Sequence, residues 1–338
     1  MDQFNVYKDM KARTNGEIYI GVVGPVRTGK STFIKRFMNL MVLPNIEDEN
    51  DRNRANDELP QSSSGKTIMT TEPKFVPNEA VSIKTEEGIE LNVRLIDCVG
   101  YMVEGATGHM EGEEERLVKT PWFDYEIPFT KAAAIGTKKV ITEHSTIGVV
   151  VTCDGSFGEI AAKQYEPAEE ETIKQLKALK KPFVVLLNTI HPYSESTKQL
   201  AAEKEEKYQT KVLPMNLEQM KKEDIYEIIK SVLMEFPISS IGFYVPRWTE
   251  MLKKDHPLKM ELLQMARDVI TEKTTMRDIY EEQEKEYEYI TGQKLESVAM
   301  DSGEVVITVK VGDVYYYEFL SETTGMEIRN EYEFIKIM

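Results

Sequence analysis

The sequence has few cysteines and no long apolar run. Only Cys98 and Cys153 occur among 338 residues, and both follow apolar runs typical of buried strands. A disulfide-dense scaffold is therefore excluded, and buried, reduced thiols in a cytoplasmic protein are expected. No apolar run approaches the ~18 residues that a membrane-spanning helix needs, so we expect no direct membrane insertion. The first residues also lack the basic and apolar regions of a secretory signal.

The chain has fewer basic than acidic residues. The chain has 42 Lys and Arg against 58 Asp and Glu, which gives a formal net charge of −16. Because a phosphate backbone needs a basic footprint, nucleic acid is not an expected partner. Direct electrostatic docking on anionic lipid is disfavoured for the same reason. The hydrophobic content of 41% is ordinary and is sufficient for a core in each domain.

Apolar runs alternate with helical patterns over the first part of the chain. Strands are expected at 17–23, 145–155, 182–188 and 211–216, a hairpin at 74–84 and 88–96, and helices at 30–41, 166–180, 195–208 and about 218–234. Residues 44–72 are predicted to form a long loop, and 101–130 an irregular segment. Apolar strands separated by helices predict an α/β fold with a mostly parallel sheet flanked by helices. This domain is expected to cover residues 1–240.

The remaining residues, 241–338, predict a smaller α+β middle domain. Residues 257–290 have the pattern of one long charged helix or two shorter ones, and "EVVITVKVGDVYYYEFL" predicts two strands around Gly312 and Asp313. The segment 278–288 is strongly acidic, and a solvated helical face is favoured over a subunit contact. The chain stops inside a patterned element, "EYEFIKIM", so we expect it to be truncated on the C-terminal side of this domain.

A phosphate-binding loop follows the first strand. The stretch from Gly24 to Ser31 fits G-x-x-x-x-G-K-S/T (the Walker A motif) without a mismatch, between a predicted strand and a predicted helix. Its glycines let backbone N–H groups face phosphate oxygens, and the helix directs its positive end to the same anion. Lys30 is expected to reach the β- and γ-phosphates, and the Ser31 hydroxyl to bind Mg²⁺. The predicted nucleotide-binding residues in this stretch are Gly24, Arg27, Thr28, Gly29, Lys30, Ser31 and Thr32.

A second element completes a P-loop NTPase site of the GTPase-like class. Asp97 ends the predicted strand before "CVG", where a carboxylate can hold Mg²⁺, and Gly100 can offer its N–H to the γ-phosphate. Thr70 and Thr71 end the long loop, where this class places a threonine that completes the metal shell. The sequence does not decide between these two threonines. The predicted metal ligands are therefore Ser31, Asp97 and one of Thr70 and Thr71.

The motif that recognises guanine in GTPases is incomplete in this chain. A guanine-specific GTPase has N-K-x-D after a buried strand, whereas this chain has Asn188 followed by Thr189, Ile190 and His191. Without the carboxylate, guanine donors stay unpaired at a cost of roughly 1–3 kcal/mol per buried group. The pattern therefore disfavours strict guanine specificity and leaves adenine open as the base, with Asn188 retained as a nucleotide-binding residue.

The catalytic pattern also departs from many GTPases. Tyr101 follows the D-x-x-G run in place of the glutamine that orients water, so another group has to stabilise the transition state. Arg27 resembles the phosphate-loop arginine of guanylate-binding large GTPases, which acts as an internal finger. We hypothesise this role for Arg27, with a solvent- or partner-facing arginine as the equal alternative. The predicted catalytic residues are Lys30, Arg27, Asp97, Thr70 and Thr71.

Five long strings carry a more specific resemblance. They are "GVVGPVRTGKSTFIKRFMNLMVLPNI", "DELPQSSSGKTIMTTEPKFVP", "RLIDCVGY", "TPWFDYEIPF" and "EHSTIGVVVTCDGS". Together they resemble the stage IV sporulation protein A family of spore-forming Firmicutes, closely across about residues 1–250 and more loosely to the end.

The resemblance implies a spore-coat morphogenetic ATPase. Members of that family hydrolyse ATP, change conformation and self-assemble into a static homopolymer. This polymer is the basement layer of the spore coat on the mother-cell face of the forespore. By resemblance, Lys30 corresponds to the phosphate-loop lysine, Asp97 to the Mg²⁺-linked aspartate, and Thr70 and Thr71 to the sensor threonines.

The resemblance also implies partners and leaves two rival functions. Expected partners are other coat proteins and a small amphipathic membrane-anchoring peptide, stage V sporulation protein M. The family contacts this peptide through a C-terminal region that we expect to be absent here. The alternatives are a regulatory GTPase and a structural scaffold whose nucleotide site does not hydrolyse. The lost carboxylate counts against the first, and intact Lys30, Ser31 and Asp97 count against the second.

Overall fold

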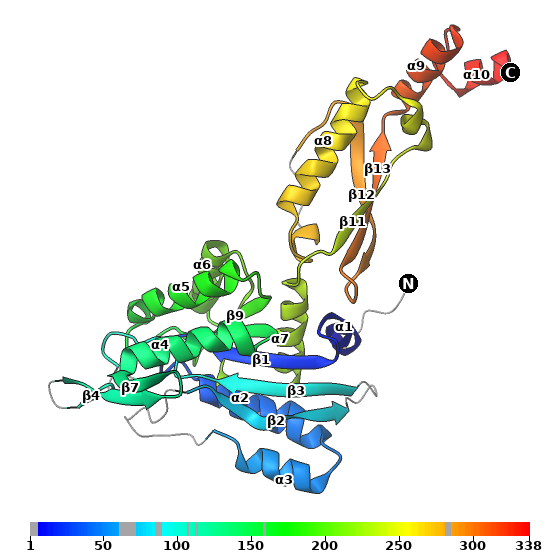
Figure 1. Ribbon diagram of the computed structural model, residues 1–338. Coiled ribbons are helices and arrows are strands. Elements are labelled where there is room, and N and C mark those ends of the chain that lie inside the picture. Colours follow the sequence, from blue (N-terminus) through cyan, green and yellow to red (C-terminus); the bar gives the residue numbers. More distant parts are fainter. Residues whose placement is uncertain are drawn as a thin grey trace. The chain divides into compact units, whose positions relative to one another are not determined.

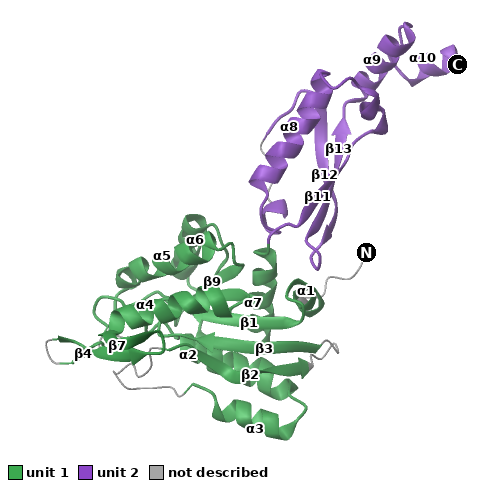
Figure 2. Ribbon diagram, viewed as in Figure 1, with its two compact units in different colours: residues 1–236 green, residues 237–338 purple. Residues whose placement is uncertain are grey.

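The chain forms two compact units, residues 1–236 and 237–338, coloured separately in Figure 2. The boundary predicted from the sequence is residue 240, four residues further along the chain. The computed structural model describes residues 6–60, 72–84, 90–106, 108–111, 114–157, 160–280 and 285–338. Each unit is described by itself.

The first unit is built on a six-stranded sheet with the order β10-β9-β8-β1-β3-β2 (Figure 1). Its strands are β1 (Glu17–Val23), β2 (Lys74–Lys84), β3 (Glu90–Asp97), β8 (Ile147–Cys153), β9 (Phe183–Asn188) and β10 (Val212–Met215). All neighbours pair in parallel except β2, which is antiparallel to β3. The predicted mostly parallel sheet and its hairpin are therefore confirmed.

Helices cover both faces of this sheet. They are α1 (Val6–Arg13), α2 (Lys30–Phe37), α3 (Glu49–Asp57), α4 (Phe129–Lys139), α5 (Ala162–Ala178), α6 (Glu195–Tyr208) and α7 (Lys222–Met234). On one face, residues of α1, α2 and α7 meet strand residues around a small apolar cavity: Met10, Phe37, Ile229, Ile18, Ile20, Leu91 and Val93. The opposite face packs against α5 and α6 through Ile173, Leu176, Ala201 and Tyr208. Alternate side chains of β1 thus serve two cores.

Two predictions for this unit were wrong. The segment predicted as a loop from 44 contains α3, whose first turn is capped by the Asp48 side chain accepting from Asp51 N at 2.9 Å. Only Ala55 of α3 is buried, so the helix has no apolar periodicity to detect. The segment 101–130 contains short hairpins of β4 (Met110–Glu111) with β5 (Glu114–Glu115) and of β6 (Leu117–Thr120) with β7 (Phe123–Pro128).

The second unit is an α+β domain with a three-stranded sheet of order β11-β13-β12. Its elements are β11 (Ser240–Tyr244), α8 (Pro257–Glu272), β12 (Ile290–Ala299), β13 (Glu304–Val311), α9 (Asp313–Thr324) and α10 (Glu331–Ile337). Strand β13 is parallel to β11 and antiparallel to β12. Buried apolar residues recur on α8 and on alternate positions of β13: Leu258, Leu262, Met265, Val269, Val305, Ile307 and Val309.

The expectations for residues 257–290 and 312–320 need correction. Helix α8 ends at Glu272, and Asp278–Tyr280 forms a short 3-10 turn inside the acidic segment, of which 281–284 lie outside the described residues. After Gly312 the chain forms α9 instead of a second strand. The Trp248 ring packs on Tyr316 and Phe319, which are one helical turn apart, so a tertiary contact favours the helix.

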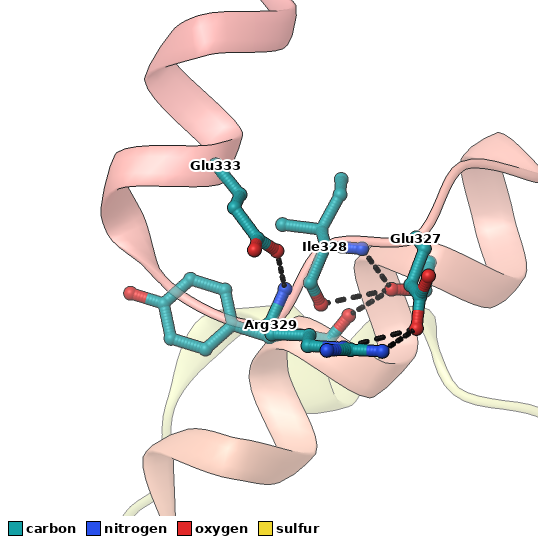
Figure 3. A network of polar contacts seen from close by, with 6 residues as sticks. Glu327, Ile328, Arg329 and Glu333 are labelled. Carbon is teal, nitrogen blue, oxygen red and sulfur yellow. Dashed lines mark hydrogen bonds and ion pairs between the residues drawn. The ribbon is translucent and has the colours of Figure 1, made fainter.

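A polar network closes the turn between α9 and α10 (Figure 3). Ser321 Oγ accepts from Ile328 N at 2.9 Å and donates to Ile328 O at 3.0 Å. The Arg329 guanidinium pairs with Glu327, and Arg329 N donates to Glu333 at 2.8 Å. These contacts fix the turn locally.

Candidate nucleotide site at the carboxyl edge of the sheet

The predicted site residues gather where four parallel strands end. Gly24 follows β1, Asp97 ends β3, and Cys153 and Asn188 end β8 and β9. Val22 is in register with Asp97, and Cys153 with Asn188. In open α/β sheets, ligands bind at this carboxyl edge. Thr70 and Thr71 lie outside the described residues.

The phosphate loop needs glycine at its two ends. Gly24 has φ of 126°, and a Cβ there would lie 2.5 Å from Val151 O. Gly29, at the start of α2, has φ of 99°, and its Cβ would lie 2.6 Å from Asn188 Nδ2. At both positions a side chain is disfavoured for two reasons: the positive φ of the backbone and the neighbouring atom that a Cβ would contact too closely.

Lys30 closes the phosphate loop. Its buried ammonium donates to Pro25 O at 2.5 Å and to Gly24 O at 3.4 Å. Burial lowers the pKa of Lys30, and the nearby Cys98 and Asp97 oppose that shift. The loop therefore wraps around a cation at the N-terminus of α2, an arrangement suited to an anion.

Ser31 and Asp97 form the part of the site that fits Mg²⁺. The Ser31 hydroxyl donates to Asp97 Oδ2 at 3.0 Å. Asp97 Oδ1 is buried and has no hydrogen-bond partner in the described part of the chain. Burial raises the pKa of Asp97, against the opposing effects of Lys30 and Ser31. A hydroxyl beside an unsatisfied carboxylate oxygen is a donor set for Mg²⁺, which takes few protein ligands besides water and phosphate.

The D-x-x-G segment is bonded directly to the phosphate loop. Gly100 has φ of 94°, and a Cβ there would lie 2.1 Å from Gly24 O and 2.6 Å from Lys30 Nζ. Tyr101 N donates to Gly24 O at 3.3 Å, and Tyr101 O accepts from Val26 N at 2.9 Å. The loop and the segment after β3 therefore form one hydrogen-bonded unit.

The Tyr101 side chain packs against apolar residues. It lies against an apolar cluster, here called the Val26 cluster: Val26, Val103, Ala106, Cys153, Ile160, Tyr165 and Ala168. Burial raises the pKa of Tyr101 to about 12. The Tyr101 ring therefore contributes to the apolar packing beside the phosphate loop.

Asn188 braces the loop through backbone groups. Its Nδ2 donates to Thr28 O at 3.0 Å, and its Oδ1 accepts from Leu217 N at 3.2 Å. Thr28 Oγ1 in turn donates to Pro25 O at 3.0 Å. The structure thus places the Asn188 amide between two loops, where its hydrogen bonds hold the phosphate loop.

The remaining predicted residues occupy different positions. Thr32 is half-buried in the first turn of α2, and Arg27 is exposed on the loop with φ of 61°. Thr189 is fully buried, and its Oγ1 accepts from His191 N at 3.1 Å. Helix α5 begins at Ala162, four residues before the predicted start at 166, so Tyr165 is helical and buried beside the loop residue Val26. Sequence reasoning missed the backbone pairing of Tyr101, for which a sequence carries no signal.

The fold and this site define a class: an α/β nucleotide-binding domain of the P-loop type, followed by a separate α+β domain. Two family models match, "Stage IV sporulation protein A, ATPase domain" over residues 1–237 and "Stage IV sporulation protein A, middle domain" over residues 238–338. The chain belongs to the stage IV sporulation protein A family, and its first unit is an ATPase domain.

Three relatives carry the same name, Stage IV sporulation protein A. The Bacillus anthracis protein is 45% identical over 340 residues, covering 100% of this chain and 69% of the relative. The Clostridioides difficile (strain 630) protein is 47% identical over 336 residues, covering 99% and 68%. The Bacillus subtilis (strain 168) protein is 44% identical over 340 residues, covering 100% and 69%.

One solved structure resembles part of the chain. A solved structure described as "crystal structure of SsGBP and GDP complex" aligns with 64% of this chain and 50% of its own, at 13% identity and a TM-score of 0.37. Among the described residues, no helix is both long and apolar enough to cross a membrane.

Proposed function

We propose that this chain binds ATP with Mg²⁺, hydrolyses it to ADP and phosphate, and uses the change of shape to self-assemble into a static polymer. Membership of a sporulation family with an ATPase domain supports this proposal. The polymer would form the basement layer of the spore coat, in the mother-cell cytoplasm at the forespore surface. Other coat proteins and stage V sporulation protein M are the proposed partners.

The observation that carries the proposal is the grouping of Lys30, Ser31 and Asp97. Lys30 presents a buried positive charge at the centre of the loop, where it would bind phosphate oxygens. Ser31 and Asp97 Oδ1, which has no hydrogen-bond partner among the described residues, would hold Mg²⁺. Mg²⁺, when bound, neutralises charge on the phosphate oxygens.

Arg27 is the proposed source of transition-state stabilisation. It is exposed on the loop between buried Val26 and Thr28, and its guanidinium is always charged. Arginine fingers accelerate hydrolysis by about 10³–10⁵. Arg27→Ala should therefore lower turnover strongly, and unchanged turnover would rule out this role.

Adenine is the proposed base because no carboxylate stands at position 191. A competition assay between ATP and GTP tests this choice, with His191→Asp as the variant that restores an aspartate. We expect ATP to be preferred by the wild type and GTP to gain on ATP in the variant. A wild-type preference for GTP would instead support the regulatory GTPase.

Assembly is tested separately from hydrolysis. Light scattering is measured with ATP, with a non-hydrolysable analogue and with Lys30→Ala protein. We expect assembly with ATP and wild-type protein alone. Equal scattering with ATP and the analogue would show that hydrolysis is not the driver and would favour the scaffold.

A further inference from the structure

The sheet of the second unit has two edge strands, β11 and β12, and they differ in how well their edges are protected. Strand β12 has two irregularities of register and two exposed charged residues, Lys294 and Glu296. Bulges and charges are the devices that keep an edge strand from pairing with another chain. Strand β11 keeps a regular register with β13 from Ser240 to Tyr244 and contains no charged residue. The edge at β11 is therefore the less protected of the two.

The backbone of β11 pairs on one side only within the described part of the chain. Just before the strand both sides are occupied, because Ile238 N donates to Thr274 O at 3.0 Å and Ser239 N donates to Gly303 O at 2.8 Å. Among the described residues, β11 itself pairs with β13 alone, and no residue of β11 is buried. Since successive strand residues direct their backbone groups to opposite sides, about half of the N–H and C=O groups of β11 face away from β13. Such groups are a template for one more strand.

The sequence of β11 fits an antiparallel copy of itself centred on Gly242. In that register Ile241 lies opposite Phe243 of the second copy, and an aliphatic side chain facing an aromatic ring stabilises an antiparallel pair. Ser240 lies opposite Tyr244, whose side chain is 65% exposed in the single chain. Two copies with a net charge of −16 each repel one another, so an uncharged strand is where their backbones approach at the lowest electrostatic cost.

We propose that β11 pairs in antiparallel orientation with β11 of a second copy of this chain, so that two three-stranded sheets join into one continuous sheet. The contact is isologous, since the same strand serves both copies. An isologous contact closes after two copies, so growth beyond a dimer requires a second contact elsewhere on the chain. The pairing itself does not depend on nucleotide, whereas its place in a polymer rests on the proposed function.

The test places a charge at the centre of this contact. A Cβ at Gly242 would have its nearest described neighbour, a Val306 methyl group, at 3.8 Å, so a single copy accommodates a side chain there. In the pair, Gly242→Lys brings two ammonium groups face to face. Gly292→Lys on β12 is the matched control, because a Cβ there has no described atom within 4 Å.

Sedimentation velocity of the full chain without nucleotide measures the effect, at up to about 100 µM because a short interface is weak. We expect dimers of the wild type and of Gly292→Lys. Gly242→Lys should raise the Kd of the dimer at least tenfold. Thermal unfolding of each variant checks that the fold is retained.

A mixture of variants tests the register of the pair. Gly242→Lys and Gly242→Asp proteins should each be monomeric alone and should pair when mixed in equal amounts, because opposite charges then face each other. A monomeric wild type, dimers that survive Gly242→Lys, or a mixture that stays monomeric overturns the pairing. Light scattering with ATP tests the polymer separately. Dimers without ATP-dependent scattering would mean that the strand contact stands and the proposed function fails.

Discussion

The Ser31 hydroxyl and the Asp97 carboxylate meet at 3.0 Å and join the first turn of α2 to the end of β3. The pair leaves Asp97 Oδ1 buried without a hydrogen-bond partner in the described residues. A buried carboxylate in this state costs folding free energy unless a cation completes it. We therefore infer that this carboxylate is kept for binding.

Asp97→Asn should separate this binding role from stability. The amide keeps the shape and removes the charge, so we expect ATP turnover to fall by about 100-fold. Without metal or nucleotide, the variant should be at least as stable as wild type. Turnover against Mg²⁺ concentration and thermal unfolding measure the two effects, and a variant that is markedly less stable would contradict this account.

The same carboxyl predicts a pH dependence. Burial raises the pKa of Asp97 in the folded protein above the 3.8 of the unfolded chain. At a pH between the unfolded and the folded pKa, the folded protein therefore binds more protons than the unfolded chain. The free energy of unfolding contributed by Asp97 is therefore highest at low pH and falls as pH rises through the folded pKa. The stability difference between Asp97→Asn and metal-free wild type should therefore grow as pH rises above 3.8, which thermal unfolding at a series of pH values measures.

Gly100→Ala should disrupt the site through a steric clash. A Cβ at Gly100 would lie 2.1 Å from Gly24 O, so the phosphate loop or the segment after β3 has to move. Gly105→Ala is the matched control, because Gly105 also has positive φ (84°) but its nearest neighbour would lie at 3.6 Å. We expect Gly100→Ala to lose ATP binding, measured by calorimetry, and Gly105→Ala to retain it. Equal binding by both variants would show that the close approach is not needed.

Asn188→Ala tests whether Asn188 holds the phosphate loop in place or contacts the nucleotide base. The variant leaves Thr28 O and Leu217 N without their partner, at about 1–3 kcal/mol for each group that stays unsatisfied. Because both contacts are to backbone, KM should rise by the same factor for ATP and for GTP. Steady-state kinetics with each nucleotide decide the matter. A change in the ATP-to-GTP preference would mean that Asn188 contacts the base.

The buried Glu169–Lys204 ion pair should contribute to the free energy of unfolding of the first unit. Glu169 on α5 is fully buried, and its Oε1 lies 2.6 Å from Lys204 Nζ on α6. Thr152 of β8 also donates to Glu169. Lys204→Met should cost about 3–5 kcal/mol because it leaves a buried charge unpaired. Glu169→Gln in the same chain should recover much of this loss in urea unfolding, and a lack of recovery would show that the lysine acts through packing alone.

The sequence predicted most of the first unit because its signals are local. Buried strands appear as apolar runs, and the phosphate loop appears as glycines at fixed spacing between a strand and a helix. Asp97 was predicted because the ends of neighbouring parallel strands meet at one edge. Helix α3 escaped prediction because it buries only Ala55, and α9 because its aromatic residues fit a strand pattern as well as a helical one.

The chemistry at the sheet edge was thus determined by the sequence itself: a cationic loop from Gly24 to Lys30, a carboxylate at Asp97 and no carboxylate at position 191. Only the tertiary structure decided that Tyr101 bonds the loop through its backbone, that Asn188 bridges to Leu217, and that Tyr165 packs in one cluster with Val26. The physical reason is the separation along the chain of the residues that interact. Backbone conformation and side-chain chemistry act over a few residues, whereas these contacts join segments far apart in the chain and exist only after the sheet has formed.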